Sequence, residues 1–149
     1  MMKKKVLITS MGGYGSLSVV NGLSYKNRKK IDFFGTHNDL YLLKRAEKIC
    51  KKIYLVPGVI NQKKYLKENL NLIKKNKIDI LLPNSDREVF LFSKYRNKIK
   101  SKIFLPNHKD IELCQNKKKF LNFLKNYKLN YPYFMNIKNE RDINIFLRK

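Results

Sequence analysis

The sequence of 149 residues has the length of one ordinary domain, and its 43% share of apolar residues excludes a disordered chain. Its formal net charge of +23 creates a surface that attracts polyanions. Because the lysines are scattered through every segment, we interpret them first as a solvated basic surface, with binding to nucleic acid or acidic lipid as the alternative. Nucleic acid is therefore not the expected partner.

The cysteines and the apolar runs indicate the cellular location of the protein and whether it binds zinc. Cys50 and Cys114 have no second cysteine or histidine at zinc-ligand spacing, so both are predicted to be buried thiols. The apolar run at residues 6–8 is shorter than an export signal requires, and no later stretch approaches the length of a membrane span. We expect a cytoplasmic protein with no membrane partner, no metal ligands and no catalytic triad.

Apolar runs alternate with helical patterns along the first part of the chain. Strands are predicted at residues 6–8, 31–35, 53–56, 78–82 and 103–105. Helices are predicted just after a glycine-rich turn at 10–16, through 40–46, at 63–76 and 87–95, and around 111–113. This alternation predicts an α/β fold with a doubly wound, Rossmann-like parallel sheet and helices on both faces. In such sheets the ligand site lies beyond the carboxyl ends of the strands.

After Pro106 the pattern changes to helices without strands. A helix is predicted with one apolar face, followed by an extended segment at 130–134 and a last amphipathic helix. The apolar residues of these two helices are Phe120, Phe123, Leu124 and Tyr127 in the first, and Ile143, Phe146 and Leu147 in the last. An exposed apolar face on a terminal helix indicates a packing partner, so we expect the chain to be a piece of a longer protein.

The turn between the first predicted strand and its helix is the first candidate site. Its candidate residues for binding a substrate or an anion are Gly12, Gly13, Gly15 and Ser16. A strand that feeds glycine-rich backbone into a helix N-terminus presents free N–H groups to an anion. The dinucleotide fingerprint is incomplete, because Ser18 stands at its third glycine and no acidic residue ends the second strand. The turn thus either binds an anion or only reverses the chain.

The loop after the fourth predicted strand is the second candidate site. Asp86 and Glu88 lie beside the carboxyl end of that strand, where carboxylates can orient a substrate amine or hydroxyl. The alternative is structural, because Ser85 or Asp86 can cap the next helix and Glu88 is favourable in its first turn.

A third candidate is Lys117, which follows Asn116 and precedes two further lysines at the start of a predicted helix. Three lysines at the positive end of a helix repel one another and the helix dipole unless an anion binds there. This favours phosphate binding by Lys117, and a solvated helix face is the alternative.

The order of these features resembles a known family. The strand and glycine turn at 6–16, the segment Lys-Ile-Tyr-Leu-Val-Pro-Gly at 52–58, the run Ile-Asp-Ile-Leu-Leu-Pro at 78–83, and then Asp86 and Glu88 are similar to the pre-ATP-grasp domain of carbamoyl phosphate synthase large chain-like proteins. The segments at 111–117 and 130–132 are similar to the stretch that joins this domain to the ATP-grasp fold, with Asn116 in place of the usual Asp.

The resemblance implies two parts. Residues 1–113 are expected to form the pre-ATP-grasp Rossmann-like domain, and residues 114–149 the linker helices that begin a truncated ATP-grasp domain. It also implies that Lys117 reaches nucleotide phosphates and that the glycine turn and the loop with Asp86 and Glu88 face the substrate.

The implied function is that of the N-terminal, substrate-side domain of an ATP-grasp carboxylate–amine or carboxylate–thiol ligase, which works through an acyl phosphate. The chain alone is expected to be inactive, because the family residues that hold magnesium follow the matched segment. ATP and Mg²⁺ are the implied cofactors of the parent protein, a small-molecule carboxylate is the implied substrate, and a homodimer is allowed. The alternative is a free-standing nucleotide- or nucleic-acid-binding module with a basic surface.

Overall fold

A five-stranded parallel sheet organises the first unit of the structure, a computed structural model that describes residues 3–148. The strands are β1 (Lys4–Ile8), β2 (Ile31–His37), β3 (Lys52–Leu55), β4 (Ile80–Leu82) and β5 (Lys102–Ile103), in the order β3-β2-β1-β4-β5. All five predicted strands are present, and every neighbouring pair is parallel. The contacts divide the chain into one unit that ends at Ile111 and a second that begins at Glu112.

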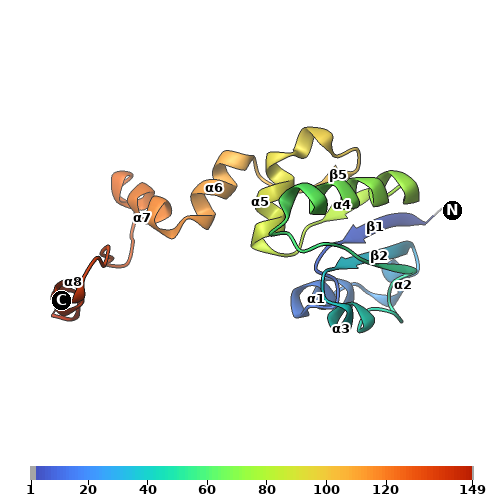
Figure 1. Ribbon diagram of the computed structural model, residues 1–149, viewed down its shortest axis with the longest axis horizontal. Helices are drawn as coiled ribbons and strands as arrows, with labels where there is room; N and C mark the ends of the chain where they lie inside the picture. Colours follow the sequence, from blue (N-terminus) through green and yellow to red (C-terminus); the bar gives the residue numbers. More distant parts are fainter. Residues whose placement is uncertain (1–2, 149) are drawn as a thin grey trace. The chain divides into compact units, whose positions relative to one another are not determined.

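Helices cover both faces of the sheet (Figure 1). They are α1 (Tyr14–Asn21), α2 (Tyr25–Arg28), α3 (Leu40–Lys44), α4 (Gln62–Asn76) and α5 (Asp86–Lys94). The short 3₁₀ helix η1 (Arg96–Lys98) follows α5, and α6 (His108–Gln115) runs across the boundary between the two units. Figure 1 shows α4 and α5 on one side of the strands and α1 to α3 on the other. The doubly wound α/β fold predicted from the sequence is confirmed.

The alternation of side chains along each strand builds a core on each face. In β1, Leu7 packs into the core under α4 and α5, whereas Val6 and Ile8 pack into the core under α1 and α3. In β2, Phe34 packs into the core under α4 and α5, and Phe33 packs into the core under α1 and α3. The central strands β1 and β2 contain apolar runs because both of their faces are buried.

Two helices differ from the sequence prediction, each because of a polar cap. The sequence predicts no helix at 25–28, but the Ser24 side chain accepts a hydrogen bond from the backbone N–H of Asn27 and begins α2. The helix expected around 111–113 begins earlier, at His108, because the Asn107 side chain accepts from the backbone N–H of Asp110 at 3.0 Å.

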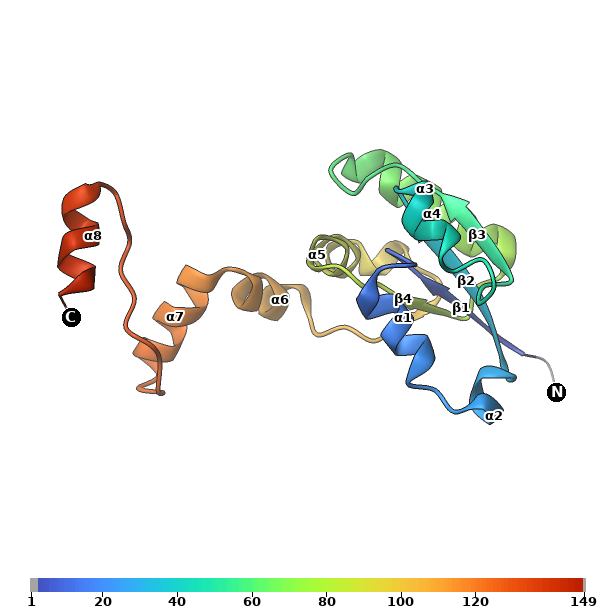
Figure 2. The ribbon, with the colours of Figure 1, turned by 90° about the horizontal axis from the view of Figure 1, so that it is seen from below.

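The second unit consists of the end of α6, α7 (Lys117–Asn126) and α8 (Glu140–Leu147), the last two joined by an extended segment (Figure 2). None of residues 112–148 is buried. Cys50 is buried in the first unit, as predicted, but the prediction for Cys114 is wrong, because Cys114 lies on the part of α6 that belongs to this open unit. Among the described residues, no helix has the length and apolar character needed to cross a membrane.

Candidate functional site at the carboxyl edge of the sheet

The strand order brings two loops together beyond the carboxyl end of β1. The chain crosses from β1 to β2 on one side, and β4 pairs with the other side of β1. The loops after β1 and β4 therefore leave the sheet side by side at the point where the strand order reverses, which is where open α/β sheets bind ligands. Residues 9–13 and 83–85 form these two loops.

The glycine turn after β1 is shaped by contacts that exclude side chains. Gly12 has a φ of +96°, and a Cβ added there would lie 1.8 Å from the backbone oxygen of Leu42. The hydroxyl of Ser16 is fully buried, accepts a hydrogen bond from the Gly12 N–H at 3.0 Å and donates one to the Gly13 carbonyl at 2.8 Å. The Gly12 N–H and the Ser16 hydroxyl thus form hydrogen bonds within the turn and stabilise its shape.

The start of α1 leaves backbone donors open above this turn. Gly13 is the N-cap of α1 and supplies no side-chain cap, and no acidic residue lies in the first turn. The N–H groups of Tyr14 and Gly15 have no carbonyl partner within the helix, because the first N–H groups of an α-helix never do. Tyr14 is 82% exposed, and the Arg45 guanidinium lies 5.1 Å from its ring centroid. The combination of open donors and a nearby cation suits an anion.

Gly15 also connects this turn with the loop after β4. A Cβ added to Gly15 would lie 3.2 Å from the side-chain oxygen of Asn84. The start of α1 and the loop after β4 therefore meet at Gly15 and Asn84. Asp86 follows as the first residue of α5 and is exposed, in a position where the helix dipole favours a carboxylate.

Glu88 is buried beneath the loop after β4, which it organises. It is 3% exposed, and its carboxylate accepts hydrogen bonds from the Thr9 hydroxyl at 2.8 Å and the Tyr65 hydroxyl at 2.5 Å. It also accepts from the backbone N–H groups of Ser85 at 3.0 Å and Asn84 at 3.3 Å. These four donors compensate the cost of burying a carboxylate. Glu88 thereby connects β1, α4 and the β4–α5 loop.

Burial raises the pKa of Tyr65 far above its usual range, and the neighbouring charge and hydrogen bond of Glu88 raise it further. Tyr65 therefore stays protonated and donates to Glu88. A second buried pair continues this network, in which the Thr36 hydroxyl donates to the Asn69 side-chain oxygen at 3.2 Å and the Asn69 amide donates to the Tyr65 carbonyl at 2.9 Å.

Sequence reasoning missed Thr9, Thr36, Tyr65 and Asn69. It predicted the helix at 63–76 without assigning any of its polar side chains to the site. The missed signal is the spacing of Tyr65 and Asn69, which are four residues apart on a buried helix face and therefore lie one above the other.

Lys117 belongs to the second unit, whereas the glycine turn and the loop at 84–88 meet in the first. It is the first residue of α7 and is exposed. The side chain of Asn116 caps this helix by accepting from the Lys119 N–H at 3.0 Å, and the Lys119 ammonium pairs with Glu112 at 2.9 Å. Among the described residues, no group of three His, Cys, Asp or Glu side chains converges to hold a metal ion.

Comparison with known proteins gives matches among solved structures alone. No protein-family model and no curated protein sequence matches the chain. The biotin carboxylase domain of 2-oxoglutarate carboxylase from Hydrogenobacter thermophilus matches 99% of this chain with a TM-score of 0.65 and 18% identity. L-amino acid ligase from Bacillus licheniformis matches 95% with a TM-score of 0.67 and 14% identity. N5-carboxyaminoimidazole ribonucleotide synthetase from Thermotoga maritima matches 97% with a TM-score of 0.58 and 19% identity.

These three proteins are ATP-grasp enzymes, and this chain spans 33%, 34% and 36% of their respective lengths. At such low identity the likeness concerns the fold. The chain has the α/β fold of the N-terminal part of these enzymes, as the resemblance in the sequence predicted. A closer relation to carbamoyl phosphate synthase stays a prediction.

Proposed function

We propose that this chain is the N-terminal, substrate-side domain of an ATP-grasp ligase that activates a carboxylate as an acyl phosphate and transfers it to an amine or a thiol. The observation that carries this proposal is the uncapped start of α1, which lies beside Asn84 of the β4–α5 loop, in a fold shared with ATP-grasp enzymes. The setting that we propose is the cytoplasm, where ATP is available.

Within this proposal, the open N–H groups of Tyr14 and Gly15 bind the anionic group of the substrate. Asn84 lies beside them and can donate or accept a hydrogen bond. Asp86 orients the amine or hydroxyl group of a substrate. Glu88 is a positioning residue, because its carboxylate holds the backbone of Asn84 and Ser85 in place from below.

ATP supplies the phosphoryl group in such a reaction, and Lys117 is the residue of this chain that we assign to its phosphates. Among the described residues no carboxylate pairs with Lys117, so this exposed lysine at the first position of a helix can reach an anion directly, and Lys118 beside it adds to the positive potential. Among the described residues no three His, Cys, Asp or Glu side chains converge, so we assign none of them to Mg²⁺. The rest of an ATP-grasp fold completes the site in this proposal.

The test is a titration of the ¹⁵N-labelled full chain, followed amide by amide. Inorganic phosphate should shift the amide signals of Tyr14 and Gly15, and Mg-ATP should shift those of residues 117–119. Lys117→Ala should weaken Mg-ATP binding by about three- to fivefold, the size expected for one exposed charge contact. Lys125→Ala, on the last turn of the same helix, is the matched control and should leave the affinity unchanged.

Equal effects of the two lysine substitutions would contradict the role of Lys117. Shifts from phosphate that avoid the α1 start would contradict the substrate site. Titration with a single-stranded oligonucleotide tests the alternative function, a nucleic-acid-binding module. Shifts spread over many lysines that disappear with added salt indicate charge attraction alone, whereas saturable binding that survives salt would favour a nucleic-acid-binding module.

A further inference from the structure

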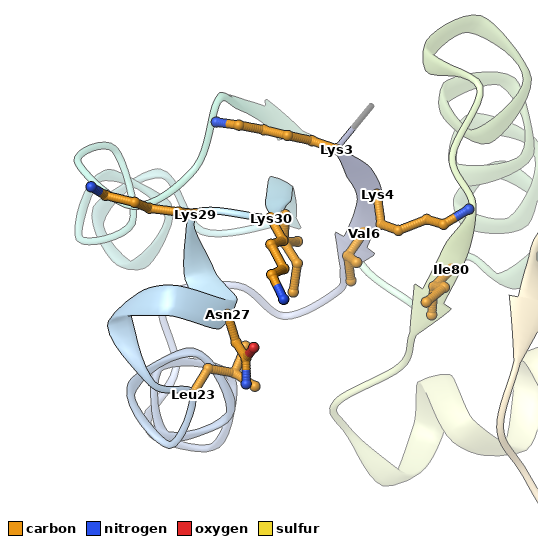
Figure 3. A pocket seen from close by; sticks show the side chains of 9 residues that line it. Lys3, Lys4, Val6, Leu23, Asn27, Lys29, Lys30 and Ile80 are labelled. Carbon is orange, nitrogen blue, oxygen red and sulfur yellow. The ribbon is translucent and has the colours of Figure 1, made fainter. Parts of the chain in front are cut away.

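A hollow lies at the opposite end of the sheet from the candidate site, where the strands begin (Figure 3). It has a volume of about 460 Å³, within the range of cavities that hold small molecules. Its floor consists of the apolar side chains of Val6, Leu23, Ile31 and Ile80. Nothing in the proposed ligase function uses this end of the sheet.

The apolar floor follows from the register of the sheet. Val6 pairs with Ile80 across β1 and β4, so the two side chains lie next to each other on the same face. Leu23 and Ile31, at the two ends of the segment that carries α2, complete the floor. Ile80 and Leu23 are each half-buried, so the floor remains accessible from outside.

The rim of the hollow carries positive charge in excess of its acidic partners. It contains Lys3, Lys4, Lys29 and Lys30. Lys3 and Lys4 each lie 3.8 Å from a carboxylate oxygen, of Asp32 and Asp79 respectively. The Asp32 carboxylate has a closer partner in Lys51, at 2.7 Å, whose hydrogen bond is the main reason that the pKa of Asp32 is lowered.

Lys30 is the lysine of the rim best placed to receive a ligand. Figure 3 shows its side chain extending over the hollow between Asn27 and Val6, whereas Lys3 and Lys29 extend away from it. The ammonium of Lys29 lies over the ring of Tyr25, 4.3 Å from its centroid. Among the described residues, no carboxylate lies within ion-pairing distance of Lys30.

We propose that this hollow binds a small amphipathic anion, with its apolar chain on the floor and its carboxylate or phosphate head at Lys30 and Asn27. Charge complementarity selects this occupant. A second copy of the chain carries the same net charge of +23 and is repelled. A highly charged polyanion gains nothing from an apolar floor, because desolvating that floor needs an apolar group. The proposal does not rest on the ligase function.

The test uses the full chain with decanoate and decyl phosphate, each below its micelle concentration, and with decanol as the neutral analogue. Saturable shifts are expected at the amides of Val6, Ile31 and Ile80. Decanoate should bind about tenfold more tightly than octanoate, because each buried methylene group contributes a factor of about four at most. The two head groups distinguish a carboxylate ligand from a phosphate ligand.

Lys30→Ala should weaken binding of the favoured anion about three- to fivefold and leave decanol binding unchanged. Lys26→Ala, an exposed lysine on α2 outside the hollow, is the matched control and should have no effect. The proposal is overturned if decanol binds as tightly as both anions, if the shifts lie elsewhere, or if the two lysine variants behave alike. Because Lys30 is exposed, Lys30→Ala should leave the fold intact, so a change in binding reports on the contact with the ligand.

Discussion

The two units of the chain contain similar sequence patterns with different results. Helix α5 in the first unit and α8 in the second both begin with an acidic residue at the third helical position that accepts from the N-cap backbone, and both have an apolar face. In α5 that face is buried, with Leu91 and Phe92 inside the core. In α8 no residue is buried. An amphipathic pattern therefore predicts a helix, but it does not tell whether its apolar face has found a partner.

The largest contrast is expected from truncating one phenylalanine in each unit. Phe92 is fully buried, so Phe92→Ala should lower the free energy of unfolding by about 3–5 kcal/mol. Phe146 is 39% exposed and stacks on Tyr133 with a centroid distance of 5.4 Å, so Phe146→Ala should cost below about 1 kcal/mol. Denaturant unfolding of both variants measures the difference. A cost of several kcal/mol for Phe146 would show that α8 is packed in solution.

The two helix-start carboxylates give the next contrast. Glu88→Ala should cost about 2–4 kcal/mol, because it leaves the buried hydroxyls of Thr9 and Tyr65 without their acceptor. Asp142→Ala removes an acceptor for exposed backbone N–H groups that water can replace, and should cost about 0.5–1 kcal/mol.

The same denaturant curves supply the measurement for this pair. Glu88→Gln sharpens the assignment, because it keeps the shape and removes the charge. It should fall between the wild type and Glu88→Ala. Equal losses for Glu88→Ala and Asp142→Ala would contradict the role of Glu88 as the centre of a buried network.

The cysteines offer a contrast without any substitution. Burial raises the pKa of the Cys50 thiol to about 12, whereas Cys114 is exposed. At pH 8 iodoacetamide should modify Cys50 at least about 100-fold more slowly than the exposed Cys114, because Cys50 is buried and the thiolate is the reactive form. Mass spectrometry of the digested protein after timed quenching measures both rates. In denaturant the two rates should become similar, because unfolding exposes Cys50. Similar rates for the two thiols in native buffer would contradict the burial of Cys50.

The sheet was largely predictable because each strand is an apolar run between turn residues. Val6, Leu7 and Ile8 identify β1 without any long-range information, and Pro83 marks the end of β4. The order of the strands was not predictable from these runs alone. The pairing of Val6 with Ile80 joins positions far apart in the sequence, and no local pattern encodes it.

The site was less predictable, because the direction of a side chain depends on tertiary contacts. Asp86 and Glu88 look alike in the sequence, two residues apart after a strand. The helix that they begin turns Asp86 toward solvent and Glu88 toward Thr9 and Tyr65. The glycine turn was found from its composition, yet the hydrogen bonds between Ser16 and the backbone of Gly12 and Gly13 could be seen only in the structure.

The central position of β1 has a consequence for how the protein is made. β1 to β3 leave the ribosome before β4, so one edge of β1 has no partner while the chain from Leu55 to Leu82 is synthesised. At roughly 5–20 residues per second, that interval lasts on the order of seconds. An unpaired apolar edge is a template for wrong strand pairing. Nascent chains of this protein are therefore expected to need shielding by a chaperone until β4 arrives.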